Sequence, residues 1–198
     1  MADIIKASGK ELANEFSSEL IQTYLSCLSN KENNVRNNAI YGLGVLVSLG
    51  IEKCASQYPD ILSAFWKILA NEKTDTVRDQ VLGAVGRMIL AANENQNINV
   101  PTDPMVQGLL QALPVRVDPM ELAPVVLSLE NYIPTLSDEQ LNVLIKNTAQ
   151  IASDYNKSLE DETKIAITRL MKRVQTERAG VLESLNEEEK AAIQMACV

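Results

Sequence analysis

Histidine is absent from the 198-residue sequence, and this absence removes whole classes of functional site. The usual zinc constellations and the Ser-His-Asp triad both need an imidazole, so neither can be assembled. Cys27, Cys54 and Cys197 are too far apart for a CxxC pair, and no histidine is present to activate a thiol. We therefore expect no metal, no cofactor and no enzymatic activity, and we interpret the cysteines as small buried hydrophobes.

Aromatic residues and long apolar runs are also scarce. Aromatic residues make up 4% of the chain, whereas apolar residues make up 46% and are mostly Leu, Ile, Val and Ala. The longest nearly unbroken apolar stretch, residues 39–51, is shorter than the roughly 18 residues that a membrane span needs. The amino terminus lacks a basic stretch followed by an apolar run, so we expect an intracellular protein without a membrane partner.

Positive charge is in the minority in this chain. The 26 acidic and 18 basic residues give a formal net charge of -8, and the pI is near 4.7. Such a field repels phosphate backbones and attracts basic partners, which disfavours direct binding of nucleic acid. The alternative is that the acidic residues only keep the surface soluble.

The most informative feature that is present is an internal repeat. Residues 34–40, NVRNNAI, return as residues 76–82, TVRDQVL, at a displacement of 42 positions (77 minus 35). Periods of about 40 to 47 residues are typical of the paired helices of HEAT and armadillo arrays, in which each unit covers the apolar face of its neighbour. We predict an all-α HEAT-repeat solenoid, a single array over residues 1–198 that binds partners.

Apolar periodicity and capping signals divide the chain into about four to five antiparallel helix pairs and a short capping helix at the carboxyl end. Ser137 and Gln140 have a capping-box pattern, and Asn186 precedes three acids that suit the start of a helix. A loop over residues 93–102 is expected between the second and third repeats. The predicted helices span residues 10–28, 34–49, 56–70, 76–92, 103–113, 118–132, 137–151, 159–174 and 186 onward.

The repeat places polar and acidic side chains at equivalent positions of successive second helices. A step of 42 positions leads from Asn37 to Asp79, and a second step leads to Glu121. Since second helices line the concave face of a solenoid, we predict a ladder of side chains there that meets an extended peptide. Ordinary solvated helix faces are the alternative. The candidate peptide-binding residues are Asn34, Asn37, Asn38, Tyr41, Asp75, Asp79, Gln80, Asp118, Glu121 and Glu130.

This ladder predicts how a basic segment is bound. Asn37 and Asn38 are expected to hold its backbone while the acidic residues meet its charges, so that affinity falls with salt. Exposed ion pairs contribute only about 0 to 1 kcal/mol each, so binding needs several pairs or an anchor such as Tyr41. Replacement of Asp79 by lysine is expected to weaken binding of a basic peptide without unfolding the chain.

Five other residues are interpreted as structural. Gly44 and Gly86 are equivalent in the repeat and indicate close helix packing, because glycine inside a helix costs up to about 1 kcal/mol relative to alanine. Arg36 and Arg78 are also equivalent and are expected to bond a loop acid or carbonyl in the adjoining repeat. Trp66 lies in an apolar segment and is expected to pack rather than to form a platform for a peptide.

Three strings, in the same order along the chain, carry a resemblance to a known family. VRNNAIYGLGVL at residues 35–46, VRDQVLGAVGRMIL at 77–90 and LLQALPVRVDPMEL at 109–122 resemble the carboxy-terminal repeats of karyopherin-β nuclear import receptors. RLMKRVQT at 169–176 and LNEEEKAAIQ at 185–194 are similar to the final helix and tail of one member. The resemblance covers most of the chain.

The resemblance implies a carboxy-terminal piece of a receptor that shuttles between cytoplasm and nucleus. Its implied partners are basic cargo proteins, notably core histones three and four or their amino-terminal tails, and ribosomal proteins. Ran GTPase would bind only through amino-terminal repeats that this chain lacks. Residues 115–121 depart from the family in being less acidic, which weakens Glu121 as one end of the ladder.

Two alternatives come from other functional classes. The first is a HEAT-repeat scaffold that joins protein partners without a preference for basic peptides. The second is a DNA-repair glycosylase built on HEAT-like repeats, which would need a basic groove for nucleic acid and a placed catalytic acid. The acidic balance of the chain argues against the glycosylase.

Overall fold

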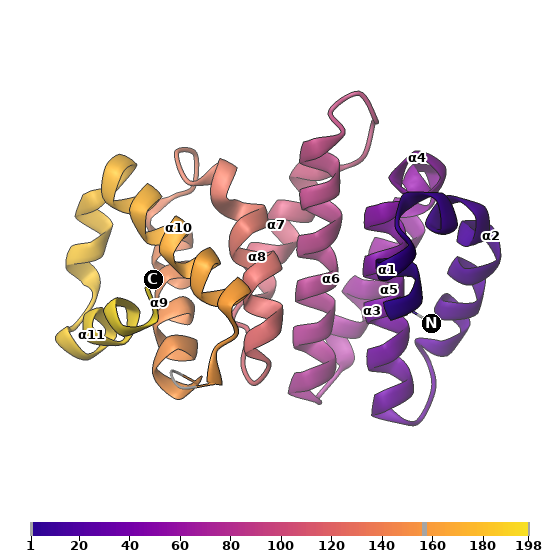
Figure 1. The fold of residues 1–198 in the computed structure, drawn as a ribbon. Helices are drawn as coiled ribbons and strands as arrows, with labels where there is room; N and C mark the ends of the chain where they lie inside the picture. The colour runs from indigo at the N-terminus through magenta and orange to yellow at the C-terminus, as the bar shows by residue number, and fades with distance from the viewer. Residues whose placement is uncertain (1, 156–157, 198) are drawn as a thin grey trace.

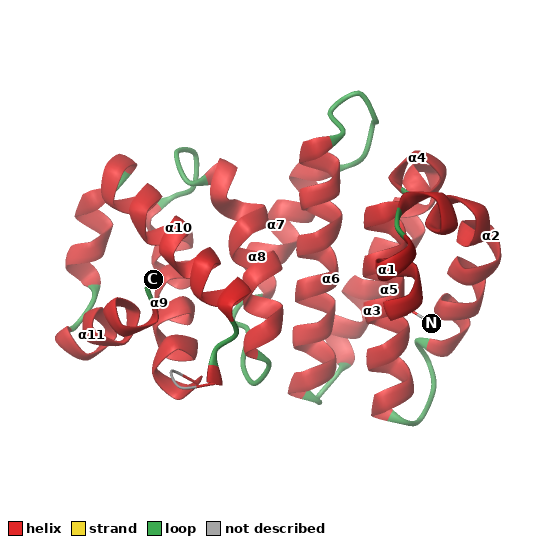
Figure 2. Cartoon of the chain, in the orientation of Figure 1, coloured by secondary structure: helices red, strands yellow, loops and turns green. Residues whose placement is uncertain are grey.

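The protein is built from helices joined by short loops, and no strand occurs among the residues that the computed structural model describes, 2–155 and 158–197 (Figure 2). Met1, residues 156–157 and Val198 of the expected 1–198 array lie outside the described residues. The prediction of an all-α protein is confirmed.

In the part of the chain that the structure describes, four antiparallel helix pairs follow one another, each with a first and a second helix. The pairs are α2 (Lys10–Cys27) with α3 (Asn33–Leu49), α5 (Tyr58–Asn71) with α6 (Asp75–Glu94), α7 (Thr102–Ala112) with α8 (Leu122–Leu129), and α9 (Asp138–Tyr155) with α10 (Asp161–Glu177).

Shorter elements extend and connect these pairs. Helix α1 packs on α2 and α3, and α11 packs on α9 and α10 at the other end of the array. The remaining short elements form links between the longer helices. The bounds are α1 (Ala2–Ser8), α4 (Ile51–Cys54), η1 (Ala55–Gln57), η2 (Pro119–Glu121), η3 (Glu130–Tyr132), η5 (Ala179–Ser184) and α11 (Glu187–Ala196).

The second helices stack side by side in the order α3, α6, α8 and α10, and the two chain ends lie at opposite ends of the stack (Figure 1). We call the face formed by these four helices the inner face. Helix α1 lies against α3 on this side (Figure 1). Apolar side chains between successive pairs form a continuous buried core along the stack. This arrangement is the predicted HEAT-repeat solenoid, closed at its carboxyl end by the short helix α11.

The capping signals read from the sequence form the expected bonds. The Gln140 backbone N–H donates to Ser137 Oγ at 3.1 Å, and the Ser137 N–H donates to Gln140 Oε1 at 3.0 Å. Asn186 and Glu189 form the same reciprocal pair at the start of α11. The sequence did not predict α1, α4 or η5, because elements this short show too little periodicity.

Arg36 and Arg78 both have a structural role. Arg36 Nη2 lies 2.7 Å from Glu72 Oε2 in the next repeat, and Arg36 Nη1 donates to the Asn30 carbonyl at 2.8 Å. Arg78 Nη1 donates to the Leu69 carbonyl at 2.7 Å. Arg36 therefore bonds to an acid of the adjoining repeat, as predicted, whereas Arg78 joins α6 to the last turns of α5 within its own repeat and not to an adjoining one.

Small residues let the second helices approach closely. A Cβ placed on Gly86 of α6 would lie 2.6 Å from the carbonyl oxygen of Pro124 in α8. A Cβ on Gly44 of α3 would lie 2.8 Å from the Cβ of Ala84 in α6. Both distances are shorter than any ordinary carbon contact, so the packing interpretation of Gly44 and Gly86 is confirmed.

Among the described residues, no single helix has the length and apolar content to cross a bilayer. The pair Asn33–Leu49 and Ile51–Asn71 passes together by length and composition only, and it is bent by 104°.

Replacement of Gly86 by alanine is expected to destabilise the fold, because the added methyl group forces α6 away from the Pro124 carbonyl. Overpacking of this kind costs about 1 to 3 kcal/mol in the free energy of unfolding. Gly180→Ala is the matched control, since nothing lies within 4 Å of a Cβ at Gly180. Urea denaturation measures both variants. Equal midpoints for the two would contradict close backbone packing at Gly86.

Candidate peptide-binding site on the inner face

A hollow of about 460 Å³ opens on the inner face where α3, α6, α8 and α10 come together, and we call it the inner hollow. Five of the candidate residues line it: Asn38, Tyr41, Gln80, Asp118 and Glu121. The repeat thus brought together side chains that are up to 83 positions apart (121 minus 38). The other residues that line the inner hollow are Lys6, Arg87, Leu90, Met120, Pro124, Leu127 and Glu162.

A buried carboxylate lies at the base of the inner hollow. Glu121 is 4% exposed, and its Oε1 accepts hydrogen bonds from Gln80 Nε2 at 2.6 Å and from Arg87 Nη2 at 3.0 Å. Arg87 Nη1 lies 2.8 Å from Glu121 Oε2. Burial raises the pKa of Glu121, while the charge and hydrogen bond of Arg87 act in the opposite direction. Glu121 is therefore engaged within the chain and is not a free rung of a ladder.

The Arg87 guanidinium also faces an aromatic ring. Its central carbon lies 5.1 Å from the centroid of the Tyr41 ring, a distance typical of a cation–π contact. Tyr41 belongs to α3, Arg87 to α6 and Glu121 to η2, so this cluster links three successive repeats. Tyr41 is half-buried and keeps its predicted place on the inner face.

Gly83 provides the space that the Glu121 carboxylate occupies. A Cβ on Gly83 would lie 1.4 Å from Glu121 Oε2, so no larger residue fits beneath the carboxylate in this position. The structure shows that a side chain of the next repeat fills the space.

Asp79, the centre of the predicted ladder, is fully buried. Its carboxylate accepts backbone hydrogen bonds from Arg116 at 3.0 Å, Val117 at 2.7 Å and Asp118 at 3.0 Å. Burial raises the pKa of Asp79, and these three N–H groups lower it. The structure contradicts the expected position of Asp79 on an accessible ladder. We now expect Asp79→Lys to destabilise the fold, because a lysine cannot accept these bonds and would bury a charge.

The loop that Asp79 holds is also fixed from the following repeat. Asn147 of α9 accepts the Val115 N–H at 2.9 Å through its Oδ1 and donates its Nδ2 to the Val115 carbonyl at 2.7 Å. The Tyr155 hydroxyl donates to the Val117 carbonyl at 2.9 Å. This two-sided attachment places Asp118, at the end of the loop, and Glu121, which follows the loop, at the inner hollow.

The remaining candidate residues lie on the inner face or at its edge, outside the inner hollow. Asn34 is exposed and Asn37 is half-buried, both in the first turns of α3. Asp75 pairs with Arg116 at 2.6 Å, and Glu130 pairs with Arg169 at 2.6 Å. The two acids are already paired within the chain, so a bound cation would have to compete with an arginine.

Three charged residues of the inner hollow, Lys6, Arg87 and Glu162, were missed from the sequence. Lys6 lies in α1, a helix that the sequence did not predict. Arg87 interrupts the apolar run of residues 84–92, and a lone charge there was the available signal. Glu162 lies 41 positions after Glu121 (162 minus 121), so one more step of the repeat would have reached its neighbour Thr163. Glu162 is exposed, and with Asp118 it supplies acidic charge at the opening.

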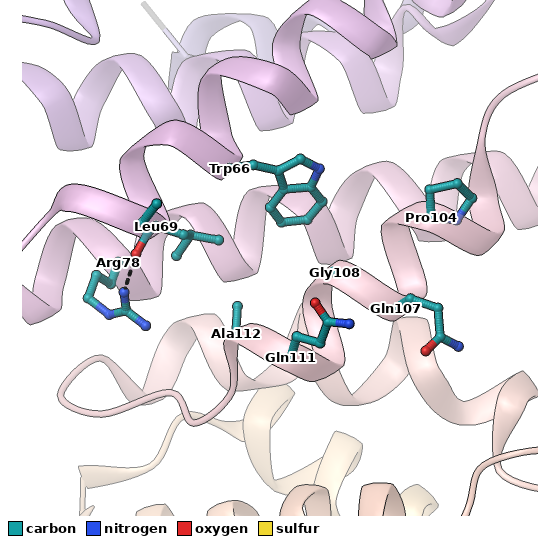
Figure 3. Close-up of a pocket in the computed structure, with 9 residues that line it drawn as sticks. Trp66, Leu69, Arg78, Pro104, Gln107, Gly108, Gln111 and Ala112 are labelled. Atoms are coloured by element: carbon teal, nitrogen blue, oxygen red, sulfur yellow. Dashed lines mark hydrogen bonds between the residues drawn. The ribbon is translucent and has the colours of Figure 1, made fainter.

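A second hollow, of about 490 Å³, lies between the first helices α5 and α7 (Figure 3). Trp66 lies over Gly108 there, and a Cβ on Gly108 would be 2.6 Å from the indole ring. Arg78 borders the same hollow, with its bond to the Leu69 carbonyl (Figure 3). The interpretation of Trp66 as a packing residue is confirmed, although its ring stays half-buried.

Comparison with curated proteins finds importins. The chain is 33% identical over 118 residues to human importin-4, which covers 60% of this chain and 10% of that protein. It is 34% identical over 119 residues to importin-4 of Mus musculus, with the same coverage. Over 172 residues it is 26% identical to the probable importin subunit beta-4 of Schizosaccharomyces pombe, covering 85% of this chain and 16% of that protein.

The chain spans between about a tenth and a sixth of the length of the curated relatives that it matches. No family model matches it. A solved structure of an engineered protein covers 94% of this chain with 15% identity and a TM-score of 0.41, which is too low to support an argument. The matches to the importins confirm the resemblance: the chain is a relative of the karyopherin-β import receptors.

The buried contacts of Asp79 lead to a prediction about stability. Asp79→Asn is expected to lower the free energy of unfolding by about 2 to 4 kcal/mol, because an amide has one acceptor oxygen where the carboxylate uses two, and it lacks the charge that strengthens these bonds. Asp75→Asn, which neutralises a half-exposed acid on the same helix, should cost about 1 kcal/mol or less. Chemical denaturation followed by circular dichroism tests both. Similar losses in the two variants would contradict the structural role of Asp79.

Proposed function

Because this chain is related to karyopherin-β receptors, we propose that it forms a cargo-binding region of a nuclear import receptor that binds basic protein segments. The observation that carries the proposal is the inner hollow, where polar and acidic side chains of four successive repeats converge, with Asn38 and Glu162 exposed and Gln80 and Asp118 half-buried. We propose histone amino-terminal tails, in particular those of histones three and four, as these segments, because they are basic and the resemblance to import receptors implies them. Such a receptor would work in both cytoplasm and nucleus.

The accessible side chains define how a segment would lie on the inner face. Asn38 is exposed on α3 and can bond to a peptide backbone, while Asp118 and Glu162 can meet lysine or arginine side chains. Asp79 takes no direct part in this revised arrangement. Exposed ion pairs contribute only about 0 to 1 kcal/mol each, so a segment must engage several positions along the face to bind firmly.

The charge of the whole chain supports the same class of partner. A net charge of -8 favours approach of a basic segment and disfavours nucleic acid. Ribosomal proteins, which are also basic, are further candidate cargo. The alternative proposal, a HEAT-repeat scaffold without a preference for basic segments, draws on the half-buried Trp66 beside the hollow between α5 and α7.

A titration of the protein with a fluorescent histone tail peptide tests the proposal, with a scrambled peptide of equal charge as control. We expect sequence-dependent binding that weakens from low to physiological salt, because screened ion pairs contribute to affinity. Equal weak binding of both peptides would reduce the proposal to general acidity. Absence of peptide binding, together with salt-insensitive binding of an apolar partner, would favour the scaffold.

Two neighbouring acids allow the position of the peptide to be tested. Glu162→Lys reverses a charge that lines the inner hollow, whereas Asp161→Lys reverses one that does not line it, in the same first turn of α10. We expect Glu162→Lys to weaken binding of the tail peptide about three- to tenfold and Asp161→Lys to change it less than twofold. Fluorescence anisotropy measures both dissociation constants. Equal losses would place the peptide elsewhere on the acidic surface.

A further inference from the structure

The Arg87 guanidinium lies in surroundings that would suit the arginine of a bound peptide. It contacts the Tyr41 ring, with its central carbon 5.1 Å from the centroid, and it pairs with the Glu121 carboxylate at the base of the inner hollow. An aromatic face and a buried carboxylate are the two groups that bind a guanidinium most strongly in proteins. The position is filled by a side chain of the protein itself.

The walls of this position are held independently of Arg87. Gln80 Nε2 donates to Glu121 Oε1 at 2.6 Å, and the missing Cβ of Gly83 leaves the space in which the carboxylate lies. Tyr41 is fixed by its place on α3, next to the buried Ile40 and Gly42. If the Arg87 side chain left, a nine-tenths buried carboxylate and a ring face would remain in place. A buried carboxylate without a cation is strongly unfavourable, so another cation would be favoured there.

The bond between Arg87 and Glu121 is incomplete. Arg87 Nη2 makes a hydrogen bond of 3.0 Å to Oε1, but Nη1, although 2.8 Å from Oε2, has no partner in hydrogen-bond geometry among the described residues. Arginine and carboxylate can form two parallel hydrogen bonds when both groups are free to align. The backbone of α6 constrains Arg87, whereas an arginine that enters from a peptide can align both bonds.

The Arg87 side chain also has space to move away from Glu121. Its side chain is 21% exposed and lines a hollow of about 460 Å³, so it can rotate toward solvent without moving a helix. Asp118 and Glu162 line the same hollow, and either can pair with the displaced guanidinium. Lys6 is the other cation of the hollow. Displacement of Arg87 from Glu121 by another cation would therefore replace one ion pair by two and leave no buried charge without a partner.

We infer that Tyr41 and Glu121 form a binding position for a guanidinium, that Arg87 occupies it in the free protein, and that an arginine of the bound segment replaces Arg87. The inference rests on the proposed function for the identity of the ligand. The binding position itself is a property of Tyr41, Glu121, Gln80 and Gly83. Arg87 acts as an internal competitor, and only segments with an arginine at the right place displace it.

Chemical rescue tests the binding position without any cargo. Arg87→Ala should lower Tm, and about 20 mM N-acetyl-arginine amide should then raise the Tm of this variant by at least about 2 °C more than that of the wild type. N-acetyl-glutamine amide should have no such effect. Arg173→Ala is the matched control, since it removes an arginine of the inner-face helix α10 that pairs with Glu177 outside the hollow. Equal shifts in all proteins would overturn the inference.

A second variant keeps the test decisive if Arg87→Ala folds poorly. The double variant Arg87→Ala/Glu121→Gln removes the uncompensated charge and should recover stability. It should also lose the response to N-acetyl-arginine amide, because the carboxylate that binds the guanidinium is gone. A response that persists in the double variant would contradict the role of Glu121.

Peptide binding tests the exchange itself. Arg87→Ala should bind an arginine-containing tail peptide about three- to tenfold more tightly than the wild type, because the competitor is absent, whereas Arg173→Ala should change affinity less than twofold. Replacement of the peptide arginines by lysine should reduce the difference. Equal gains in both variants would overturn the exchange. Failure of the wild type to bind any basic peptide would instead reject the proposed function, while the rescue experiment would still decide whether the position exists.

Discussion

The close approach of the second helices is the constraint on which the inner face depends. With Gly44 against Ala84 and Gly86 against Pro124, the backbones of α3, α6 and α8 leave no room for side chains between their middle turns. Polar groups that link the repeats therefore lie above, below or to the side of these contacts. Asp79 lies about two turns before Gly86 on α6. Arg87 directly follows Gly86, and its side chain leaves the helix about 100° away from the glycine contact. The buried polar contacts of the face follow from the spacing of the helices.

The loop at residues 113–118 connects this packing to the candidate site. It is held by Asp79 of the preceding repeat and by Asn147 of the following one, so its course depends on three repeats at once. Because η2 begins directly after the loop, these same contacts position the Glu121 carboxylate in the space above Gly83. A residue that was expected to bind a ligand instead determines where another residue lies. The contacts that stabilise the array therefore also determine the shape of the site.

The sequence predicted the helices well because the signals for them are local. Apolar periodicity, the capping box at Ser137 and the acids after Asn186 each act within about one turn or a few turns, so no knowledge of the neighbouring repeat was needed. The repeat of 42 positions added the pairing and the order of the helices. What it could not predict were α1 and α4, which are too short for a periodic pattern and depend on tertiary packing.

The repeat predicted which candidate residues meet, but it did not predict how deep they lie. Asn38, Tyr41, Gln80, Asp118 and Glu121 converge because equivalent positions in stacked repeats are neighbours. Depth depends on what covers each position. Asp79 is covered by a loop that returns from 37 to 39 residues later, and Glu121 is paired with an arginine of another helix. Neither contact can be predicted from the local sequence pattern.

Net charge and local charge have different consequences for binding at this site. Asp118, Glu121 and Glu162 face Lys6 and Arg87 across the inner hollow, which leaves an excess of only one negative charge in a chain whose total is -8. Long-range attraction of a basic segment must therefore come from the rest of the surface, and it acts over about one Debye length, roughly 8 Å at physiological salt. The inner hollow can add little to that attraction. In the exchange that we propose, its contribution is discrimination, because buried Glu121 and the Tyr41 ring favour a planar cation in one orientation, whereas the outer acids accept any positive charge.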